Sequence, residues 1–153
     1  MQKSLEIIKK TRIHLLELAG SLDIEQLNKV PEGFNNNIIW NLGHLVAAQQ
    51  GVCYNRAGAG LTVDESFFED YKPGSRPERF IDQAAAEEIK RLLFSTLDQF
   101  EQDYKAGIFS TYTPWVTRYG VNISDIDTAI NFLPFHEGLH LGYVLAQKRV
   151  ILK

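Results

Sequence analysis

The sequence predicts an all-α protein built as a four-helix bundle. Four segments repeat apolar residues at the spacing of about 3.6 residues that an amphipathic helix requires, and no set of alternating strand patterns accompanies them. Gly, Pro and Asn residues interrupt the chain between these segments. Helices of this kind bury their apolar stripes against one another. The 153 residues are also the length of one domain, so we expect residues 1–153 to form a single bundle.

The composition excludes several classes of protein. A net charge of −3, without clusters of Lys and Arg, gives no reason to expect a nucleic-acid partner. No apolar run approaches the roughly 18 residues of a membrane span, so no membrane partner is expected. Cys53 is the only cysteine, which excludes an internal disulfide and favours a reducing compartment. Residues 1–10 mix charged and apolar side chains, unlike a signal peptide, and we therefore expect a cytoplasmic protein.

The first two helices follow from apolar stripes and from capping residues. The first is expected over residues 4–19, and His14 projects away from its apolar stripe toward the surface. Turn-forming residues then predict a connection over residues 20–35. The second helix begins at Asn36 or Asn37, either of which can cap it, and continues to about residue 56.

Three residues of the second helix bear on a possible site. His44 has apolar neighbours and is expected inside the protein, while Gly43 lets a neighbouring helix or ligand approach the backbone. Cys53 lies about 180° round the helix and about 13 Å along it from His44, so the two cannot share a metal on a continuous helix. We expect Cys53 to be a small packed hydrophobe.

The second half of the chain contains two long connections and two further helices. Residues 57–79 are too long for a helical hairpin and predict a link that crosses the bundle or covers a site. The third helix starts at Pro77 or Asp82 and ends near residue 105, with Gly107 as its C-terminal stop. Residues 108–122 predict an extended, packed loop, with a short hairpin as the alternative.

The fourth helix is expected from Ser124 to about Arg149, where Ser124 and Asp127 fit a capping box. Pro134 falls inside it and either kinks the helix or begins a second helical segment. The long link over residues 57–79 indicates that the second and third helices run parallel. The predicted topology is therefore up-down-down-up, with long connections between helices two and three and between helices three and four.

Three histidines converge in this topology. His136 and His140 are four residues apart, so they lie about 40° apart on one helical face. His44 lies about 12 Å from the start of its helix and His140 about 13 Å from the end of the fourth, which puts them level when the two helices are antiparallel. Three neutral imidazoles that leave a fourth position open are typical of a catalytic metal site and suit zinc or nickel. Such an ion activates water or deprotonates a thiol.

Two other interpretations of these residues stay open. The three histidines could share hydrogen bonds in a core or an interface. The stretch from His136 to His140 also matches the HExxH pattern of zinc peptidases, in which Glu137 would be the general base. No His, Asp or Glu follows His140 to supply the further ligand of such a peptidase. Glu137 is a candidate proton shuttle at the edge of the site, and its alternative role is an exposed or salt-bridged glutamate.

Two stretches carry a family resemblance: Asn36–His44 in the second helix and Phe132–Tyr143 in the fourth. Together they resemble the DinB/YfiT-like superfamily, over nearly the whole chain. The resemblance implies an up-down-down-up four-helix bundle, often dimeric, with a divalent metal on His44, His136 and His140. Similar proteins include metal-dependent hydrolases and enzymes that transfer low-molecular-weight thiols to electrophiles.

The leading hypothesis is a cytoplasmic metal-dependent enzyme, a hydrolase or a thiol transferase, that acts on a small electrophilic substrate. The alternative is a non-catalytic metal-binding or dimeric interaction module, because no second catalytic group is evident beside the histidines. An HExxH metallopeptidase is the remote alternative. A homodimer is expected, with Phe67, Phe68 and Tyr71 as candidate interface aromatics.

Overall fold

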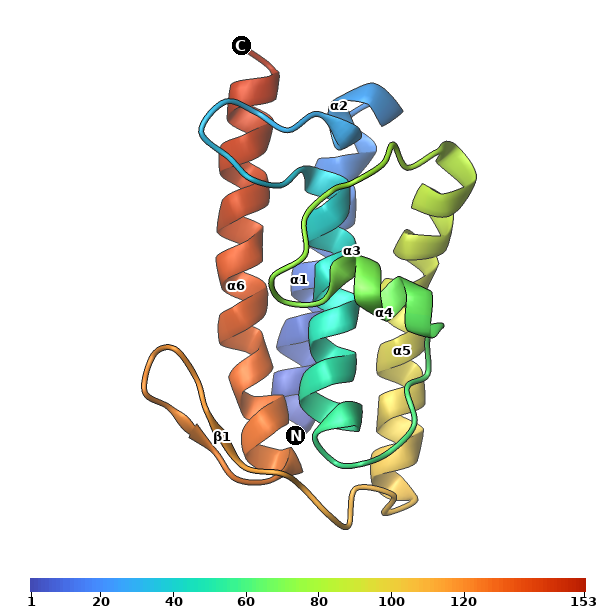
Figure 1. The fold of residues 1–153 in the computed structure, drawn as a ribbon, viewed down its shortest axis with the longest axis vertical. Coiled ribbons are helices and arrows are strands. Elements are labelled where there is room, and N and C mark those ends of the chain that lie inside the picture. The colour runs from blue at the N-terminus through green and yellow to red at the C-terminus, as the bar shows by residue number, and fades with distance from the viewer.

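Four long helices pack side by side in the computed structural model, which describes residues 1–153. They are α1 (Gln2–Gly20), α3 (Ile38–Gln49), α5 (Gln83–Lys105) and α6 (Ile126–Ile151). In the view of Figure 1, α1 and α6 run upward from their N-termini, whereas α3 and α5 run downward. Each of these helices packs against two of the others, α1 and α3 both lying between α5 and α6. The prediction of a mostly helical, all-α protein is confirmed.

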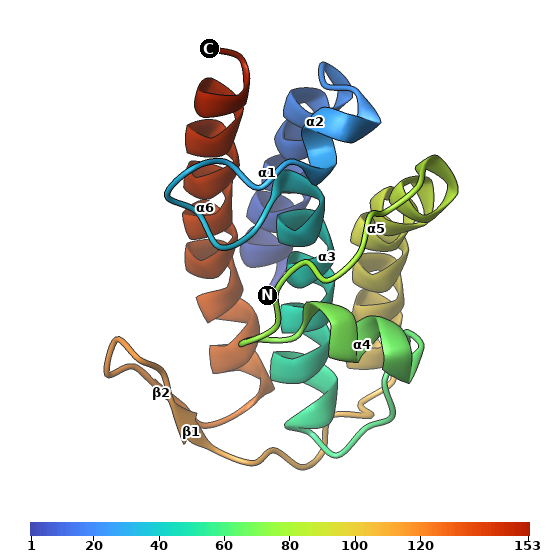
Figure 2. The ribbon, with the colours of Figure 1, turned by 45° about the horizontal axis from the view of Figure 1, so that its top comes forward.

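Two short helices lie in segments that the sequence predicts as connections. The first, α2 (Ile24–Asn28), begins with a capping box in which Asp23 and Gln26 exchange hydrogen bonds. The second, α4 (Glu65–Tyr71), lies across α3 (Figure 2). Helices of one or two turns repeat too few apolar residues for their periodicity to be visible.

The aromatic residues of α4 belong to the core of their own chain. Tyr71 is buried, and Phe67 and Phe68 are half-buried against the cluster of apolar residues that surrounds α3. These three side chains hold α4 against α3, and the expectation that they also supply a dimer interface stays a prediction.

The second predicted helix is divided in the structure. Asn37 caps α3 by accepting a hydrogen bond from the Trp40 N–H at 2.8 Å. Of the two predicted caps, Asn36 and Asn37, the structure therefore uses the second. After Gln49 the chain continues as a π-helical turn, η1 (Gln50–Asn55). Cys53 in this turn is fully buried and free, as predicted, and burial raises the pKa of its thiol.

The ends of α5 match their prediction, and the start of α6 does not. Asp82 caps α5, and Gly107 follows its last turn with a φ of 73°, where the left-handed backbone favours glycine. The capping box of α6 is formed by Asp125 and Thr128, one residue later than the predicted Ser124 and Asp127.

Pro134 lies inside α6, which continues unbroken to Ile151. The alternative of a second helical segment starting at Pro134 is therefore wrong. The missing N–H of the proline removes one backbone hydrogen bond, yet the flanking turns hold the helix together. His136 and His140 both follow on this continuous helix.

A two-stranded hairpin precedes α6, which was the alternative expectation for residues 108–122. Strands β1 (Trp115–Val116) and β2 (Asn122–Ile123) pair antiparallel, with Trp115 opposite Ile123. The hairpin lies beside the N-terminal part of α6 (Figures 1 and 2). Edge-to-face contacts of Trp115 with Phe132 and of Tyr119 with Phe135 fasten it there. No helix combines the length and the apolarity that crossing a bilayer requires.

Candidate metal centre

The three predicted histidines meet between α3 and α6. Their ligand-capable nitrogen atoms all lie within 4.8 Å of one another. The Nε2 atoms of His44 and His136 are 3.4 Å apart, and the ring centroids of His44 and His140 are separated by 4.6 Å. The structure thus brings together all three residues that the sequence places at one site.

In two of these rings, a hydrogen bond at Nδ1 fixes the tautomer. His44 Nδ1–H donates to the backbone carbonyl of Tyr71 at 2.7 Å, and His140 Nδ1–H donates to the side-chain oxygen of Asn41 at 2.7 Å. The Asn41 amide is oriented in turn, because its NH₂ group donates to the carbonyl of Asn37 at 2.8 Å. Both Nε2 atoms are therefore left with a lone pair that faces the cluster.

These lone pairs fit a divalent cation. Adjacent acceptors that face one another need a proton or a positive ion between them. Tetrahedral coordination with metal–nitrogen bonds of about 2.0–2.1 Å separates two ligand nitrogens by about 3.3–3.4 Å. The observed spacing of 3.4 Å between Nε2 of His44 and His136 matches this value. The three histidines could accordingly hold a metal ion.

The surroundings keep the three imidazoles neutral. Burial lowers the pKa of His136 to about 2, with the neighbouring His140 and His44 contributing in the same direction. Burial, followed by His44 and Arg118, lowers the pKa of His140 to about 3. Burial also lowers the pKa of His44, opposed by the hydrogen bond to Tyr71. A metal ion therefore has no bound proton to displace at neutral pH.

Gly43 allows the close approach that positions His44. A Cβ atom at residue 43 would lie 2.5 Å from the ring of Tyr71, so only glycine lets α4 pack this tightly on α3. The same approach brings the Tyr71 carbonyl to His44. The Trp40 ring stacks on the His44 ring: the two centroids are 4.6 Å apart and the ring planes are nearly parallel.

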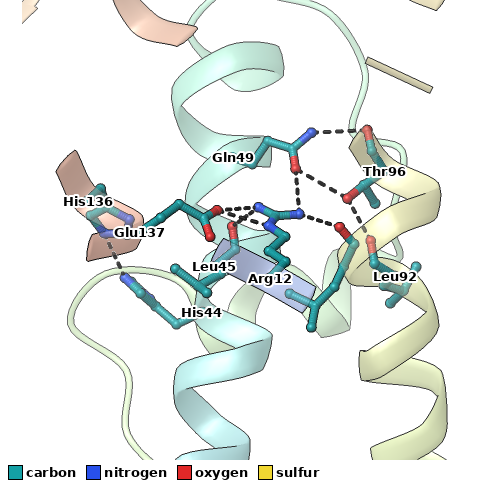
Figure 3. Close-up of polar contacts among 9 residues, drawn as sticks. Arg12, His44, Leu45, Gln49, Leu92, Thr96, His136 and Glu137 are labelled. Atoms are coloured by element: carbon teal, nitrogen blue, oxygen red, sulfur yellow. Dashed lines mark hydrogen bonds and ion pairs between the residues drawn. The ribbon is translucent and has the colours of Figure 1, made fainter. Parts of the chain in front are cut away.

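Glu137 faces away from the cluster and into the bundle. Its Oε1 accepts hydrogen bonds from Arg12 Nε at 2.9 Å and from Arg12 Nη2 at 2.7 Å (Figure 3). Both side chains are almost wholly buried. Burial raises the pKa of Glu137, and the adjacent guanidinium opposes that shift. The salt-bridged role is confirmed, and the geometry does not fit a proton shuttle or the general base of a peptidase.

Arg12 is the site-adjacent residue that the sequence interpretation misses. It also donates to the side chain of Gln49 and to the backbone carbonyls of Leu45 and Leu93, so it contacts α3, α5 and α6 from α1. The signal was present in the sequence, because Arg12 lies on the apolar stripe of its helix, four residues after Ile8. A cation on such a stripe predicts a buried anionic partner. His14, by contrast, is exposed as expected.

A cavity of about 1,010 Å³ opens onto the three histidines. Aromatic side chains form much of its wall, from Phe34, Trp40, Trp115, Tyr119, Phe132 and Tyr143. Two arginines, Arg56 and Arg118, also line it, and no Asp or Glu does. The cavity is therefore open to a small molecule. Its wall is apolar over much of its surface and carries positive charge.

Comparison with known proteins identifies the family. No curated protein matches the chain. The model of the DinB superfamily matches residues 7–144, which include most of α1, the whole of α3 and α5, the hairpin, and α6 as far as Val144. The match covers most of the chain and contains all three clustered histidines. The chain belongs to the DinB superfamily.

Proposed function

We propose that the protein is a metal-dependent enzyme in which His44, His136 and His140 hold a divalent ion, zinc or nickel. The convergence of three neutral imidazoles on one point carries the proposal. The substrate is a small electrophile, and the reaction is either hydrolysis or the transfer of a thiol. Membership of the DinB superfamily is compatible with this role.

The residues of the chain have separate tasks in this proposal. His44 and His140 are held in the ligand tautomer by Tyr71 and Asn41. A divalent ion in this site would lower the pKa of a water or thiol bound to it toward neutrality. The aromatic wall of the cavity excludes bulk water from the rest of the substrate, and the open side of the cluster gives the electrophile access.

Metal content tests the ligand assignment. Purified wild-type protein should bind about one equivalent of zinc or nickel, and His136→Ala should bind almost none. His14→Ala is the matched control, because His14 is an exposed histidine on another helix and should leave metal content unchanged. Negligible metal in the wild type after reconstitution, or equal metal in wild type and His136→Ala, would count decisively against the proposal.

Activity tests the enzymatic part. Activated esters and pairs of thiols with electrophiles should be turned over by metal-loaded protein, and chelator should abolish that turnover. A non-catalytic metal-binding module is the second candidate. One observation favours it: the cavity contains no carboxylate, and Glu137 is engaged with Arg12, so no general base stands beside the cluster. Metal binding without turnover across both screens would support the module.

The proposal includes the wider organisation of the protein. We take the four long helices to form an up-down-down-up bundle that constitutes one domain. We also expect a cytoplasmic homodimer, which sedimentation equilibrium on the purified protein would detect as twice the mass of the 17.4 kDa chain.

A further inference from the structure

The two arginines in the cavity wall have no acidic partner. The chain carries seven arginines, and three of them, Arg12, Arg79 and Arg91, form ion pairs with carboxylates. Neither Arg56 nor Arg118 does, although the chain contains 19 Asp and Glu residues and has a net charge of −3. Two positive charges therefore face a cavity without a negative one, in a protein that is acidic as a whole.

Arg56 is held in place by the wall of the cavity. It follows η1, and its guanidinium lies 5.3 Å from the ring centroid of Trp115. Its backbone carbonyl accepts a hydrogen bond from Thr113 N–H at 2.7 Å, which ties this position to the segment that leads into the hairpin. A guanidinium stacked on an aromatic face keeps its N–H edges available for a planar oxyanion.

Arg118 is positioned by the hairpin turn. Thr117 before it is buried, and its hydroxyl accepts hydrogen bonds from the N–H groups of Tyr119 and Val121. Tyr119 after it packs edge-to-face on Phe135 of α6, with ring centroids 5.1 Å apart. The backbone on both sides of Arg118 is therefore fixed. Its side chain is exposed and lines the cavity.

We propose that the cavity binds an organic oxyanion, a carboxylate or phosphate attached to an apolar body, with Arg56 and Arg118 as its charge-recognition residues. This inference rests on the proposed function, in that it takes the histidine cavity as the substrate site. Guanidinium groups bind these anions through paired N–H donors. The aromatic wall, including Trp115 and Phe132, matches the apolar body of the ligand.

Binding of matched probes tests the proposal. The probes are 3-phenylpropanoate, 2-phenylethyl phosphate and the neutral 3-phenylpropanamide, titrated by calorimetry into metal-free and metal-loaded protein. Quenching of tryptophan fluorescence gives a second readout, because both tryptophans of the chain, Trp40 and Trp115, line the cavity. At least one of the two anions should bind about tenfold or more tightly than the amide, since hydrogen bonds to charged groups are the stronger ones.

The variants assign that preference to residues. Arg56→Gln and Arg118→Gln should each reduce the preference for the anion about five- to tenfold, and the double variant should abolish it. Arg149→Gln is the matched control, because Arg149 is an exposed arginine without an ion pair and lies outside the cavity. Raising the salt concentration should weaken binding of the anions and leave the amide unaffected.

The outcomes separate this inference from the metal proposal. Preference for an anion in the metal-free protein, lost in the double variant, supports the inference even if no metal binds. No preference in the wild type overturns it, even if the protein binds metal. A preference that persists in the double variant also overturns it, because the anion would then be bound by the metal or elsewhere. Circular dichroism of each variant confirms that the fold is retained.

Discussion

Single residues determine whether the three histidines can act as ligands, because each ring has two nitrogens and only one can face the ion. The sequence alone could place His44, His136 and His140 together, since helical spacing and antiparallel packing suffice for that. It could not assign the tautomers, which depend on contacts between distant segments. The carbonyl of Tyr71 and the amide of Asn41 supply those contacts.

Replacing Asn41 should weaken metal binding without removing a ligand. In Asn41→Ala the Nδ1–H of His140 loses its acceptor, so the ring can rotate or change tautomer. Loss of such an outer contact costs roughly 10–100-fold in metal affinity. Competition with a chromogenic chelator measures this. Asn131→Ala, an exposed asparagine of α6, is the control, and equal affinities in the two variants would contradict the role assigned to Asn41.

At the scale of helices, the sequence predicts the long elements and misses the short ones. Apolar periodicity over four or more turns gives α1, α5 and α6 to within a few residues, whereas the predicted second helix is divided into α3 and η1. The helix α4 is hidden because its seven residues stand among Gly and Pro, and its aromatics suggest an interface as readily as a core. The capping box of α6 is displaced by one residue because Ser124 and Asp125 are both good N-caps, and only Asp125 is reciprocated by Thr128.

The contact between α3 and α4 predicts opposite effects for two glycine substitutions. Gly43→Ala should destabilise the protein by about 1–3 kcal/mol, because a Cβ there meets three atoms of the Tyr71 ring within 2.7 Å. Metal affinity should fall with it, since Tyr71 moves away from His44. Gly138→Ala in α6 meets no atom within 4 Å and should stabilise the helix by up to about 1 kcal/mol.

Urea titration of the two variants measures both signs in the same protein. Equal stabilisation by the two substitutions would show that α4 can move away from a methyl group at residue 43 without a loss of stability. Gly43 would then not be what sets the position of the Tyr71 carbonyl.

At the scale of the whole molecule, one buried ion pair connects the long helices. Arg12 of α1 binds the side chain of Glu137 in α6, the side chain of Gln49 in α3 and the carbonyl of Leu93 in α5 (Figure 3). Glu137 adjoins His136 in the sequence, so the pair also fixes the turn of α6 that carries two of the histidines. This explains why a charged pair is buried inside the bundle.

Removing one partner of this pair should cost more than removing both. Glu137→Gln leaves the guanidinium of Arg12 buried without a counter-ion, and the expected loss of stability is about 3–5 kcal/mol. The double variant Arg12→Met with Glu137→Leu should recover a large part of that loss, because apolar side chains of similar volume need no desolvation. Urea midpoints of Arg12→Met, Glu137→Leu and the double variant, each compared with the wild type, measure this cycle. Costs that simply add would show that the two groups do not depend on each other.

The metal-free protein should also lose stability as the pH falls below about 6.5. The pKa values of His136 and His140 in the folded protein are about 2 and about 3, whereas an unfolded histidine titrates near 6.5. Between these values the unfolded chain binds protons that the folded protein excludes, so the stabilisation present above pH 6.5 is lost as the pH falls. At pH 5 the loss is about 2 kcal/mol for each histidine.

Urea midpoints of chelated protein between pH 7.5 and pH 5 measure this slope, and the double variant His136→Asn with His140→Asn should flatten it. Glu137, whose pKa burial raises, is common to both proteins and cancels in the comparison. Parallel curves for wild type and variant would mean that these rings accept protons freely in the folded state. Added metal should raise the stability of the wild type over this pH range and leave the double variant unchanged, because the folded cluster holds no proton that the ion must displace and only the intact ligand set binds it.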